Sequence, residues 1–462
     1  MNDILALDGA SLLAAFRNRA LSPVEVVDAV LAGIERHNPV VNAFNIVDAE
    51  GARTAARRSE ARWAKRAPLG PVDGLPLTIK DNIIWAGHPA RRGSRTSSTD
   101  PVAESAPSVD RLLEAGAVPI GKTTLPEFGW KGIGDSPLTG ITRNPWDTRV
   151  TTGGSSAGAA AAAVLNLGVL HLGTDGAGSI RIPAAFCGLF GLKPTRGRIP
   201  LGPRFEDAWH GLSVLGPLAR TVADAALFLD VTADGAPPGG FAGAVAAGPG
   251  RLRIGVSTAL VPGTLARLGA DQRRAVAETA DLLRSLGHEV RDVEVDYGPR
   301  AFPSLSARYL RGIHDDAASL PRPERLERRT RSMARLGGLV PAGTVARLRR
   351  DEPALAARID RVFDGVDVLL QPGPSGPPFR IGALHGRGAL WTLNAAAAKV
   401  PWYGVWNAVG HPAASVPAGF DRHGLPLAVQ LVGPDDADAR LLALGGQLEA
   451  ARPWADRRPP VG

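Results

Sequence analysis

Apolar residues recur with helical spacing in the first 66 residues of the chain. Ser22, Pro23 and Glu25 combine a capping serine, a first-turn proline and a glutamate three residues after the cap, which together signal the start of a helix. The segment VVDAVLAGIERHN that follows keeps the apolar spacing of a helix. Residues 48–66, rich in alanine and arginine, predict a second helix. We expect these N-terminal helices to lie outside the chemistry of the protein.

From residue 68 onward, short apolar strands alternate with helical segments. In GLPLTIKDNI, residues 74–83, three apolar residues at 75, 77 and 79 alternate with Pro76, Thr78 and Lys80, as in a strand with one apolar face. APSVDRLLEAGA, residues 106–117, has the spacing of a helix instead. This alternation indicates an α/β fold, in which a sheet carries helices on its faces.

The same pattern continues to the end of the chain after an interruption. Residues 233–250, rich in Gly, Ala and Pro, predict a loop, and an arginine-rich helical insertion is expected at about residues 300–350. Around the insertion the pattern predicts a helix at 271–286 and strands at 252–256, 288–295, 366–372 and 425–433. No repeat of fixed period is present, which argues against a solenoid or a propeller.

The charge of the chain changes this interpretation little. The chain has 462 residues, 44% of them hydrophobic, and a formal net charge of +8, which is modest for its length. Nine arginines and two glutamates gather between Arg322 and Arg350, but a charge run of this kind is typical of solvated helices. We therefore expect no nucleic-acid partner.

Other features exclude several classes of protein. The single cysteine, Cys187, cannot form an internal disulfide, and the N-terminus lacks the pattern of a signal peptide. The most apolar run, residues 157–173, is interrupted by Asn166 and His171, so we expect no membrane span and a cytoplasmic protein. Nine histidines without metal-ligand spacing and a glycine-rich segment without a following Gly-Lys-Ser or Gly-Lys-Thr predict neither a metal site nor a phosphate-binding loop. We expect no cofactor.

Two adjacent serines in TTGGSSAG, residues 151–158, are the first candidate for chemistry. The pattern G-x-S-x-G is typical of the nucleophile turn of α/β-hydrolases, which would make Ser156 the nucleophile of an esterase. That turn requires a preceding strand, whereas NPWDTRVTTGG offers Pro, Asp and Gly in place of a buried apolar run. The later histidines are not distinguished by their surroundings. This hypothesis therefore stays an alternative.

A second set of residues offers chemistry without histidine. Asp175 to Ser179, in GTDGAGSIRIPAAF, form a tight turn of small residues whose backbone N–H groups are suited to hold an oxyanion. Lys80 is expected on a buried strand among hydroxyl groups, where loss of hydration disfavours its charged form. A neutral amine of this kind can act as a general base. The sequence thus supplies a base, a serine pair and a serine on a turn rich in donors.

Three motifs in this order resemble the amidase signature family. They are LTIKDN with Lys80, GGSSAG with Ser155 and GTDGAGSIRIPAAFCGLFGLKPTRGR with Ser179, and the similarity returns in GHPAASVPAG and GLPLAVQLVG near the C-terminus. The resemblance implies an α/β/α sandwich with a mixed central sheet covered by helices. It implies one amidase domain over residues 1–462, in which 1–66 are the N-terminal helices, 68–230 the core with the catalytic residues, and 252–462 the remaining strands with the insertion near the pocket.

The resemblance also implies a Ser-Ser-Lys triad. Ser179 is the expected nucleophile, Ser155, on a cis peptide bond, relays the proton, and neutral Lys80 accepts it. The N–H groups of Gly176, Ala177 and Gly178, together with that of Ser179, are the expected oxyanion hole. The family more often has glycine where this chain has Ala157 and Ala177, and a Cβ at Ala177 restricts positive φ on the oxyanion turn.

Further residues of the motifs are expected to support or surround the triad. Thr152 and Ser156 are predicted to hold the triad by hydrogen bonds, and Asp175, like Arg181, is predicted to be paired within the fold. Phe128, Gly129 and Trp130 are the predicted lining of an acyl pocket, although core packing is an equally good interpretation of Trp130.

The predicted function is a metal-free amidohydrolase that cleaves a linear carboxamide carrying an apolar or aromatic acyl group. An alternative is the glutaminase subunit of a tRNA-dependent amidotransferase, which Ile182 disfavours because that branch has glutamine at this position. A non-catalytic scaffold is disfavoured because all three triad residues are present. The expected partner is a small amide substrate; a homodimer is left open.

Overall fold

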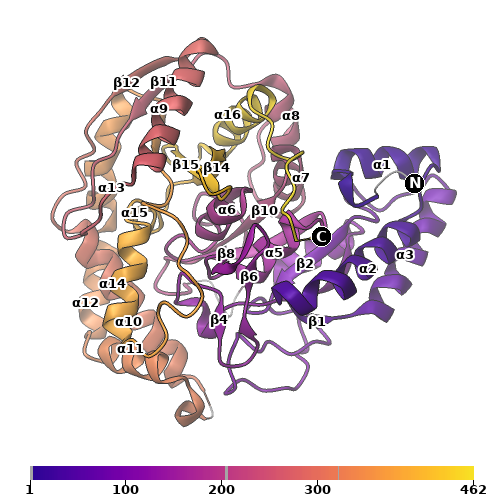
Figure 1. Ribbon diagram of the computed structural model, residues 1–462, viewed down its shortest axis with the longest axis horizontal. Coiled ribbons are helices and arrows are strands. Elements are labelled where there is room, and N and C mark those ends of the chain that lie inside the picture. The colour runs from indigo at the N-terminus through magenta and orange to yellow at the C-terminus, as the bar shows by residue number, and fades with distance from the viewer. Residues whose placement is uncertain (1–3, 203–206, 321, 462) are drawn as a thin grey trace.

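A computed structural model describes residues 4–202, 207–320 and 322–461. In these ranges eleven strands form one sheet with helices on both sides (Figure 1). Parallel pairs, such as β2 with β8, occur beside antiparallel pairs, such as β8 with β10, so the sheet is mixed. In their order across the sheet, the strands are β1 (Phe44–Val47), β3 (Val118–Thr123), β2 (Pro76–Lys80), β8 (Leu170–Asp175), β10 (Val214–Ala219), β9 (Phe190–Lys193), β14 (Ala413–Phe420), β15 (Pro426–Val432), β13 (Val368–Pro372), β11 (Arg253–Val256) and β12 (Glu289–Asp292). The predicted α/β fold with a mixed sheet covered by helices is confirmed.

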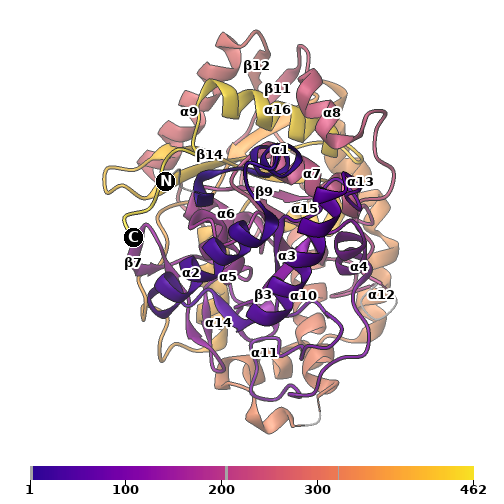
Figure 2. The ribbon, with the colours of Figure 1, turned by 90° about the vertical axis from the view of Figure 1, so that its right-hand side faces the viewer.

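Two hydrophobic cores separate the sheet from its helices. In the first core, Leu77 and Ile79 of β2 pack with apolar residues of α1 (Gly9–Asn18), α4 (Pro107–Glu114), α7 (Val222–Thr232), α9 (Ala270–Ser285) and α16 (Asp438–Ala451). The second core contains apolar residues of α2 (Pro23–Val41), α3 (Ala49–Ala64), α5 (Ala157–Val164) and α6 (Arg181–Cys187). Figure 2 shows the N-terminal helices α1 to α3 nearest the viewer, in front of the sheet.

Further helices gather on the side of the molecule away from the N-terminal helices (Figure 1). Their apolar residues Ile313 and Met333 pack against Phe128 and Trp130, so this insertion lies against the predicted pocket residues. The helices are α10 (Ala301–Ala318), α11 (Arg328–Gly338), α12 (Ala342–Arg350), α13 (Glu352–Asp360), α14 (Ala389–Lys399) and α15 (Gly404–Val409). Short 3-10 turns occur at Ile4–Ala6, Glu127–Gly129, Pro323–Arg325 and Arg361–Asp364. None of the helices in the described ranges combines the length and apolar character needed to cross a membrane.

The helices and strands that the hydrophobic pattern located are present, but other strands of the central sheet, among them β3, β8, β9 and β10, were not located by it. At the start of α2, Ser22 Oγ accepts the N–H of Glu25 at 3.2 Å and Glu25 Oε2 accepts the N–H of Ser22 at 2.8 Å, which is the predicted capping arrangement. The four strands predicted after residue 250 correspond to β11, β12, β13 and β15, and the helix predicted at 271–286 is α9.

The loop predicted at residues 233–250 is wrong in part, because it contains helix α8 (Gly240–Ala247). Phe241 is almost completely buried in the first core, against which α8 packs beside α7 and α16. Asp230, on α7, accepts the N–H groups of Phe241 and Ala242 at 2.5 and 3.1 Å. A cap that comes from another helix leaves no signal in the local sequence, which is why composition alone indicated a loop.

Candidate active site

Lys80 ends β2 and its side chain is completely buried. Because side chains alternate along a strand, Lys80 and Thr78 point away from the face that carries Leu77 and Ile79. The Nζ atom of Lys80 lies 2.7 Å from Ser155 Oγ and 2.7 Å from Thr174 Oγ1. Burial lowers the pKa of Lys80 well below its ordinary value, and the negative charge of Asp175 opposes this only in part. The site therefore favours a neutral amine next to the first serine of the pair.

The serine pair lies between a short strand and a helix. Strand β7 (Asp147–Thr151) precedes it and pairs with β6 (Arg143–Asn144) in a small two-stranded sheet apart from the central sheet. Val150 of β7 also forms an isolated antiparallel bridge with Arg380. A second small sheet consists of β4 (Asp135–Ser136) and β5 (Gly140–Ile141). The peptide bond between Gly154 and Ser155 is cis. Ser156 then begins α5. The short strand was not predicted, and Ser156 is still not presented at the end of a central strand.

Ser179 lies 24 residues further on, in the turn between β8 and α6. The turn and the serine pair are joined directly, since the N–H of Ser156 donates to the carbonyl oxygen of Ser179 at 3.1 Å. The hydroxyl of Ser156 also donates to the carbonyl oxygen of Thr174 at 3.2 Å. Ser156 is fully buried, whereas Ser179 is half-buried and lines cavities on two sides. Ser156 thus joins the segment of the serine pair to the end of β8 and to the turn that carries Ser179.

The backbone of the turn is arranged around Asp175. Gly178 has a φ of +116°, and its N–H donates to Asp175 Oδ1 at 2.6 Å, so it points inward and not toward an incoming carbonyl as expected from the sequence. Within the described chain, the N–H groups of Gly176, Ala177 and Ser179 make no hydrogen bond. Ala177 does not adopt positive φ, so its Cβ does not strain the turn. Three N–H groups therefore remain available to an oxyanion.

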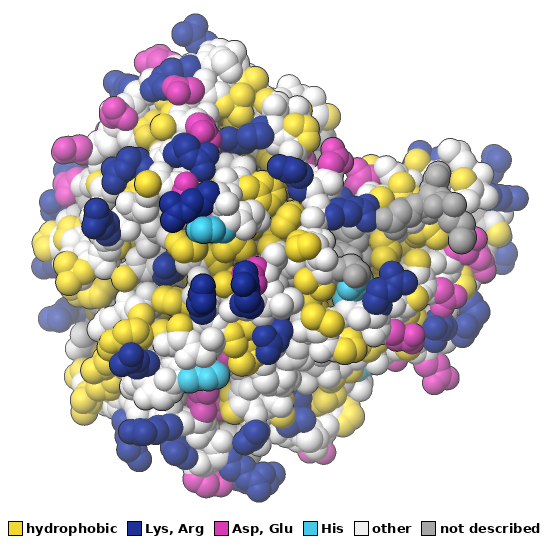
Figure 3. Space-filling model, viewed as in Figure 1, with side chains coloured by type: hydrophobic (Ala, Val, Ile, Leu, Met, Phe, Trp, Pro, Cys, Tyr) yellow, Lys and Arg dark blue, Asp and Glu magenta, His cyan; other side chains and the backbone are white. Residues whose placement is uncertain are grey.

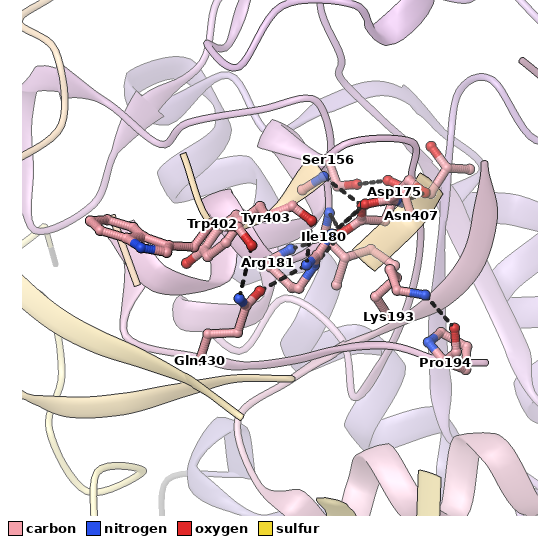
Figure 4. A network of polar contacts seen from close by, with 12 residues as sticks. Ser156, Asp175, Ile180, Arg181, Lys193, Pro194, Trp402, Tyr403, Asn407 and Gln430 are labelled. Carbon is pink, nitrogen blue, oxygen red and sulfur yellow. Dashed lines mark hydrogen bonds and ion pairs between the residues drawn. The ribbon is translucent and has the colours of Figure 1, made fainter. Parts of the chain in front are cut away.

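Asp175 and Arg181 belong to a buried network of hydrogen bonds and ion pairs (Figure 4). Both side chains are fully buried, and two guanidinium nitrogens of Arg181 contact the two carboxylate oxygens of Asp175 at 3.0 Å each. Asn407 Nδ2 donates to Asp175 Oδ1 at 2.9 Å, and Arg181 donates to Gln430 Oε1 at 2.8 Å. The Arg181 guanidinium holds the pKa of Asp175 far below its usual range despite burial. The carboxylate is therefore permanently charged and structural.

Sequence reasoning missed two members of this network. Asn407 and Gln430 lie more than 220 residues after Asp175, and only the fold brings them to it. Gln430 had a signal that was overlooked, because it is a polar residue in the otherwise apolar strand LPLAVQLVG. Asn407 carried no such signal.

The three predicted pocket residues have different positions. Trp130 lines an apolar cavity, and its indole N–H donates to Thr330 Oγ1 at 2.9 Å. Gly129 lines a polar cavity, where a Cβ would approach Ser155 Oγ to 2.9 Å. Phe128 is buried beneath the guanidinium of Arg92, 4.9 Å from its ring centre, and is not among the residues that line either cavity. Thr152, also buried, donates to the carbonyl oxygen of Gly153.

Ser179 lies between these two cavities. The apolar cavity encloses about 1000 Å³ of empty space, part of it open to solvent, and is lined mainly by apolar side chains of α10, α14 and α15 with Ala177 and Ile182 of the signature segment. The polar cavity lies on the other side, where it contacts Ser155, Thr174, Gly176 and Ser179. Neither cavity could be located from the sequence, because most of their walls come from segments distant in the chain. No group of His, Cys, Asp or Glu placed to hold a metal ion occurs in the described residues.

Comparison with known proteins decides the family. The family model described as Amidase matches residues 25–442. The chain belongs to the amidase signature family. It is therefore a hydrolase that acts on amides, as its relatives and its structural neighbours are.

The amidase resembles curated proteins of mycobacteria over its whole length. It is 45% identical over 460 residues to "Putative amidase AmiB2" of Mycobacterium tuberculosis H37Rv, with 99% of each chain covered. It is 38% identical to AmiA2 of the same organism, with 97% of this chain and 94% of the relative covered.

Solved structures with the same fold come from enzymes with several substrates. A 6-aminohexanoate cyclic dimer hydrolase matches with a TM-score of 0.86 and 30% identity, over 99% of both chains. A bacterial aryl acylamidase of the amidase signature family matches with 0.84 and 26%, over 97% of both chains. A peptide amidase from Stenotrophomonas maltophilia matches with 0.81 and 25%, over 98% of both.

Proposed function

We propose that this amidase hydrolyses linear carboxamides through a seryl acyl-enzyme with Ser179, Ser155 and Lys80 as its catalytic residues. The observation that carries the proposal is the 2.7 Å contact between Lys80 Nζ and Ser155 Oγ, combined with the presence of Ser155 and Ser179 in the wall of one cavity. A buried amine with a lowered pKa is suited to accept a proton from a serine.

In the first half of the reaction, Ser179 Oγ attacks the carbonyl carbon of the amide. Its proton passes to Ser155 Oγ, whose own proton passes to Lys80 Nζ. The N–H groups of Gly176, Ala177 and Ser179 stabilise the negative charge that develops on the carbonyl oxygen. When the C–N bond breaks, the proton returns through Ser155 to the leaving nitrogen, and an amine or ammonia is released.

In the second half, water hydrolyses the ester formed on Ser179. The water loses a proton through Ser155 to Lys80 and attacks the ester carbon, and the proton then returns to Ser179 Oγ. The acid is released and the three side chains recover their initial protonation states. The same groups thus serve both halves of the reaction.

The apolar cavity supports an apolar or aromatic acyl group. Its walls include Ala177, Ile182, Trp130, Phe302 and Leu305, together with Ser179. Ile182 offers no polar group to hold a glutamine amide, which argues against a glutaminase subunit. Ser156 as nucleophile is disfavoured because its buried hydroxyl is already donated to Thr174 and does not line either cavity.

A fluorophosphonate, which reacts with activated serines, tests the proposal. We expect one covalent adduct on Ser179, found by peptide mass spectrometry, and no adduct in Ser179→Ala. The matched control is Ser156→Ala, which should still be labelled. Labelling of Ser156 in the wild type, with Ser179 unmodified, would overturn the proposal.

A further inference from the structure

The position of the proton relay distinguishes the two cavities beside Ser179. The leaving nitrogen must receive its proton from Ser155, so it has to lie on the side of Ser179 to which Ser155 is open. Ser155 and its neighbour Thr174 line the polar cavity and not the apolar one. If the proposed function holds, the amine half of the substrate therefore occupies the polar cavity and the acyl half the apolar cavity.

Among the described residues that line the polar cavity, Trp209 has the largest aromatic side chain, and His210 lies next to it in the chain. Trp209 is held in a narrow slot, because a Cβ on Gly176 would lie 3.1 Å from its ring and a Cβ on Gly312 of α10 only 2.8 Å from its Cγ. Gly176 belongs to the oxyanion turn. The ring is thus in contact with the backbone that would hold the reacting carbonyl.

The backbone and the ring edge of Trp209 are both fixed. Trp209 has a φ of +53° and His210 one of +54°, a region that bulky residues rarely adopt. The indole N–H donates to Asp316 Oδ2 at 2.8 Å, and the ring meets Tyr309 edge to face with centres 4.8 Å apart. Tyr309 lines the apolar cavity. The Trp209–Tyr309 pair therefore lies between the two cavities.

The acidic groups around Trp209 do not offer a free charge. Asp316 pairs with Arg92, and Asp315 pairs with Arg311 at 2.8 Å and lies 3.0 Å from His210. Asp207, the third carboxylate in the described wall of this cavity, pairs with Arg349 at 3.3 Å. Because the charges of these carboxylates are compensated, the cavity has no unpaired carboxylate in these positions to select a cationic amine. Trp209 is the largest apolar side chain among the described residues that line this cavity, and so it is the group best suited to pack against an apolar substituent.

We propose that Trp209 determines specificity for the amine half of the substrate, by packing against the planar substituent of a secondary amide on the leaving nitrogen. This inference rests on the proposed function, since it assigns the leaving group to the cavity that Ser155 faces. Primary amides, which release ammonia, leave the indole without a partner. The enzyme therefore favours N-aryl amides over primary amides of the same acid.

The test compares butyranilide with butyramide, which share an apolar acyl group and differ only in the amine. We expect Trp209→Ala to lower kcat/KM for the anilide about tenfold, mainly through KM, and to change that for the primary amide less than about twofold. Aniline, the product, should inhibit the wild type more strongly than it inhibits the variant. Trp391→Ala is the matched control, because Trp391 is half-exposed and lines neither cavity.

Trp209→Leu keeps an apolar side chain but removes the flat ring. This variant replaces Trp209→Ala in the comparison if the alanine variant does not fold. Fluorophosphonate labelling counts the active sites in each preparation. An equal loss for both substrates, or an unchanged anilide preference, would overturn the role of Trp209 while leaving the proposed function intact. A wild type that hydrolyses neither amide, or a fully active Ser179→Ala, would contradict the proposed function itself.

Discussion

The position of Lys80 in the fold makes its amine suited to act as a base. It ends a strand whose five residues are all buried, and it faces two hydroxyl groups in place of a carboxylate partner. Loss of hydration therefore dominates its pKa. The same residue on an exposed strand would be a solvated cation with no role as a base.

Replacing Lys80 should abolish the reaction without unfolding the protein. We expect Lys80→Met to lower kcat about 10³-fold, in the range found for a lost general base. The control is Lys65→Met, an exposed residue at the end of α3, which should be fully active. In the wild type, kcat/KM should rise as pH rises through the lowered pKa of Lys80, because only the neutral amine accepts a proton. Circular dichroism checks folding; a Lys80→Met variant with a tenth of the activity or more would exclude lysine as the base.

The motifs that carry the proposed catalytic residues could be recognised in the sequence, and most of their surroundings could not. Lys80, Ser155 and Ser179 stand in motifs that small residues make recognisable, because glycine and serine there have no role in a hydrophobic core. Asn407, Gln430 and Trp209 come from distant segments, and each needs the fold to bring it to the turn. Gly178 was misjudged for a related reason, since the direction of an N–H depends on φ, which residue identity does not specify.

Periodicity predicted part of this fold, and it missed buried strands such as β9 and β10. It identified β2, β11, β13 and β15, which are apolar along most of their length, and α2 by its cap. It failed for α8, which consists almost entirely of Gly, Ala and Val and is held by contacts with α7 and α16. Hydrophobic periodicity cannot predict a helix or strand that has no amphipathic pattern.

The cap of α8 can be tested through Asp230. We expect Asp230→Ala to lower the free energy of unfolding by about 1 kcal/mol, since two N–H groups at the start of α8 lose their acceptor. Amide hydrogen exchange of residues 241–247 should accelerate more than that of the neighbouring helices. Asp281→Ala, which removes an exposed ion pair on α9, is the control and should change stability less. Unchanged exchange in α8 would show that packing alone maintains it.

The helices at the two sides of the molecule come from different parts of the chain. The N-terminal helices lie at one side and the insertion helices at the other, and Lys and Arg are scattered among Asp and Glu on the face shown in Figure 3. Helices α1 and α16, from opposite ends of the described chain, are both bonded to α7. Asp224 accepts the N–H of Gly9 at 2.9 Å, and Glu449 of α16 accepts that of Val222 at 2.9 Å. Both carboxyl groups are screened from water, so the stability of this junction depends on pH.

Glu449 gives this pH dependence a measurable sign. Burial, reinforced by the nearby charge of Asp224, raises the pKa of Glu449 from 4.5 to about 7, and burial raises that of Asp224 to about 6. A raised carboxyl pKa means that the folded state binds the proton more tightly, so stability is greatest below pH 4.5 for this group and declines as pH rises to about 7. Glu449→Gln removes this contribution. Relative to the wild type, the variant should gain on the order of 1–3 kcal/mol in unfolding free energy between pH 5 and pH 8.

Denaturant unfolding at several pH values measures this gain. Glu289→Gln, at an exposed position of β12, is the matched control and should follow the wild type at every pH. A constant difference between Glu449→Gln and the wild type from pH 5 to pH 8 would contradict the raised pKa.

The separation of the two cavities also has a kinetic consequence. Because the amine half fills the compartment to which Ser155 is open, water cannot reach the ester on Ser179 until the amine has departed. Release is therefore ordered, with the amine first and the acid second. After the amine has left and before the acid forms, the polar cavity is open to any small nucleophile. Hydroxylamine added to the reaction would therefore attack the ester on Ser179 and form a hydroxamate. The two cavities that hold the two halves of the substrate thus also determine the order in which the two products leave.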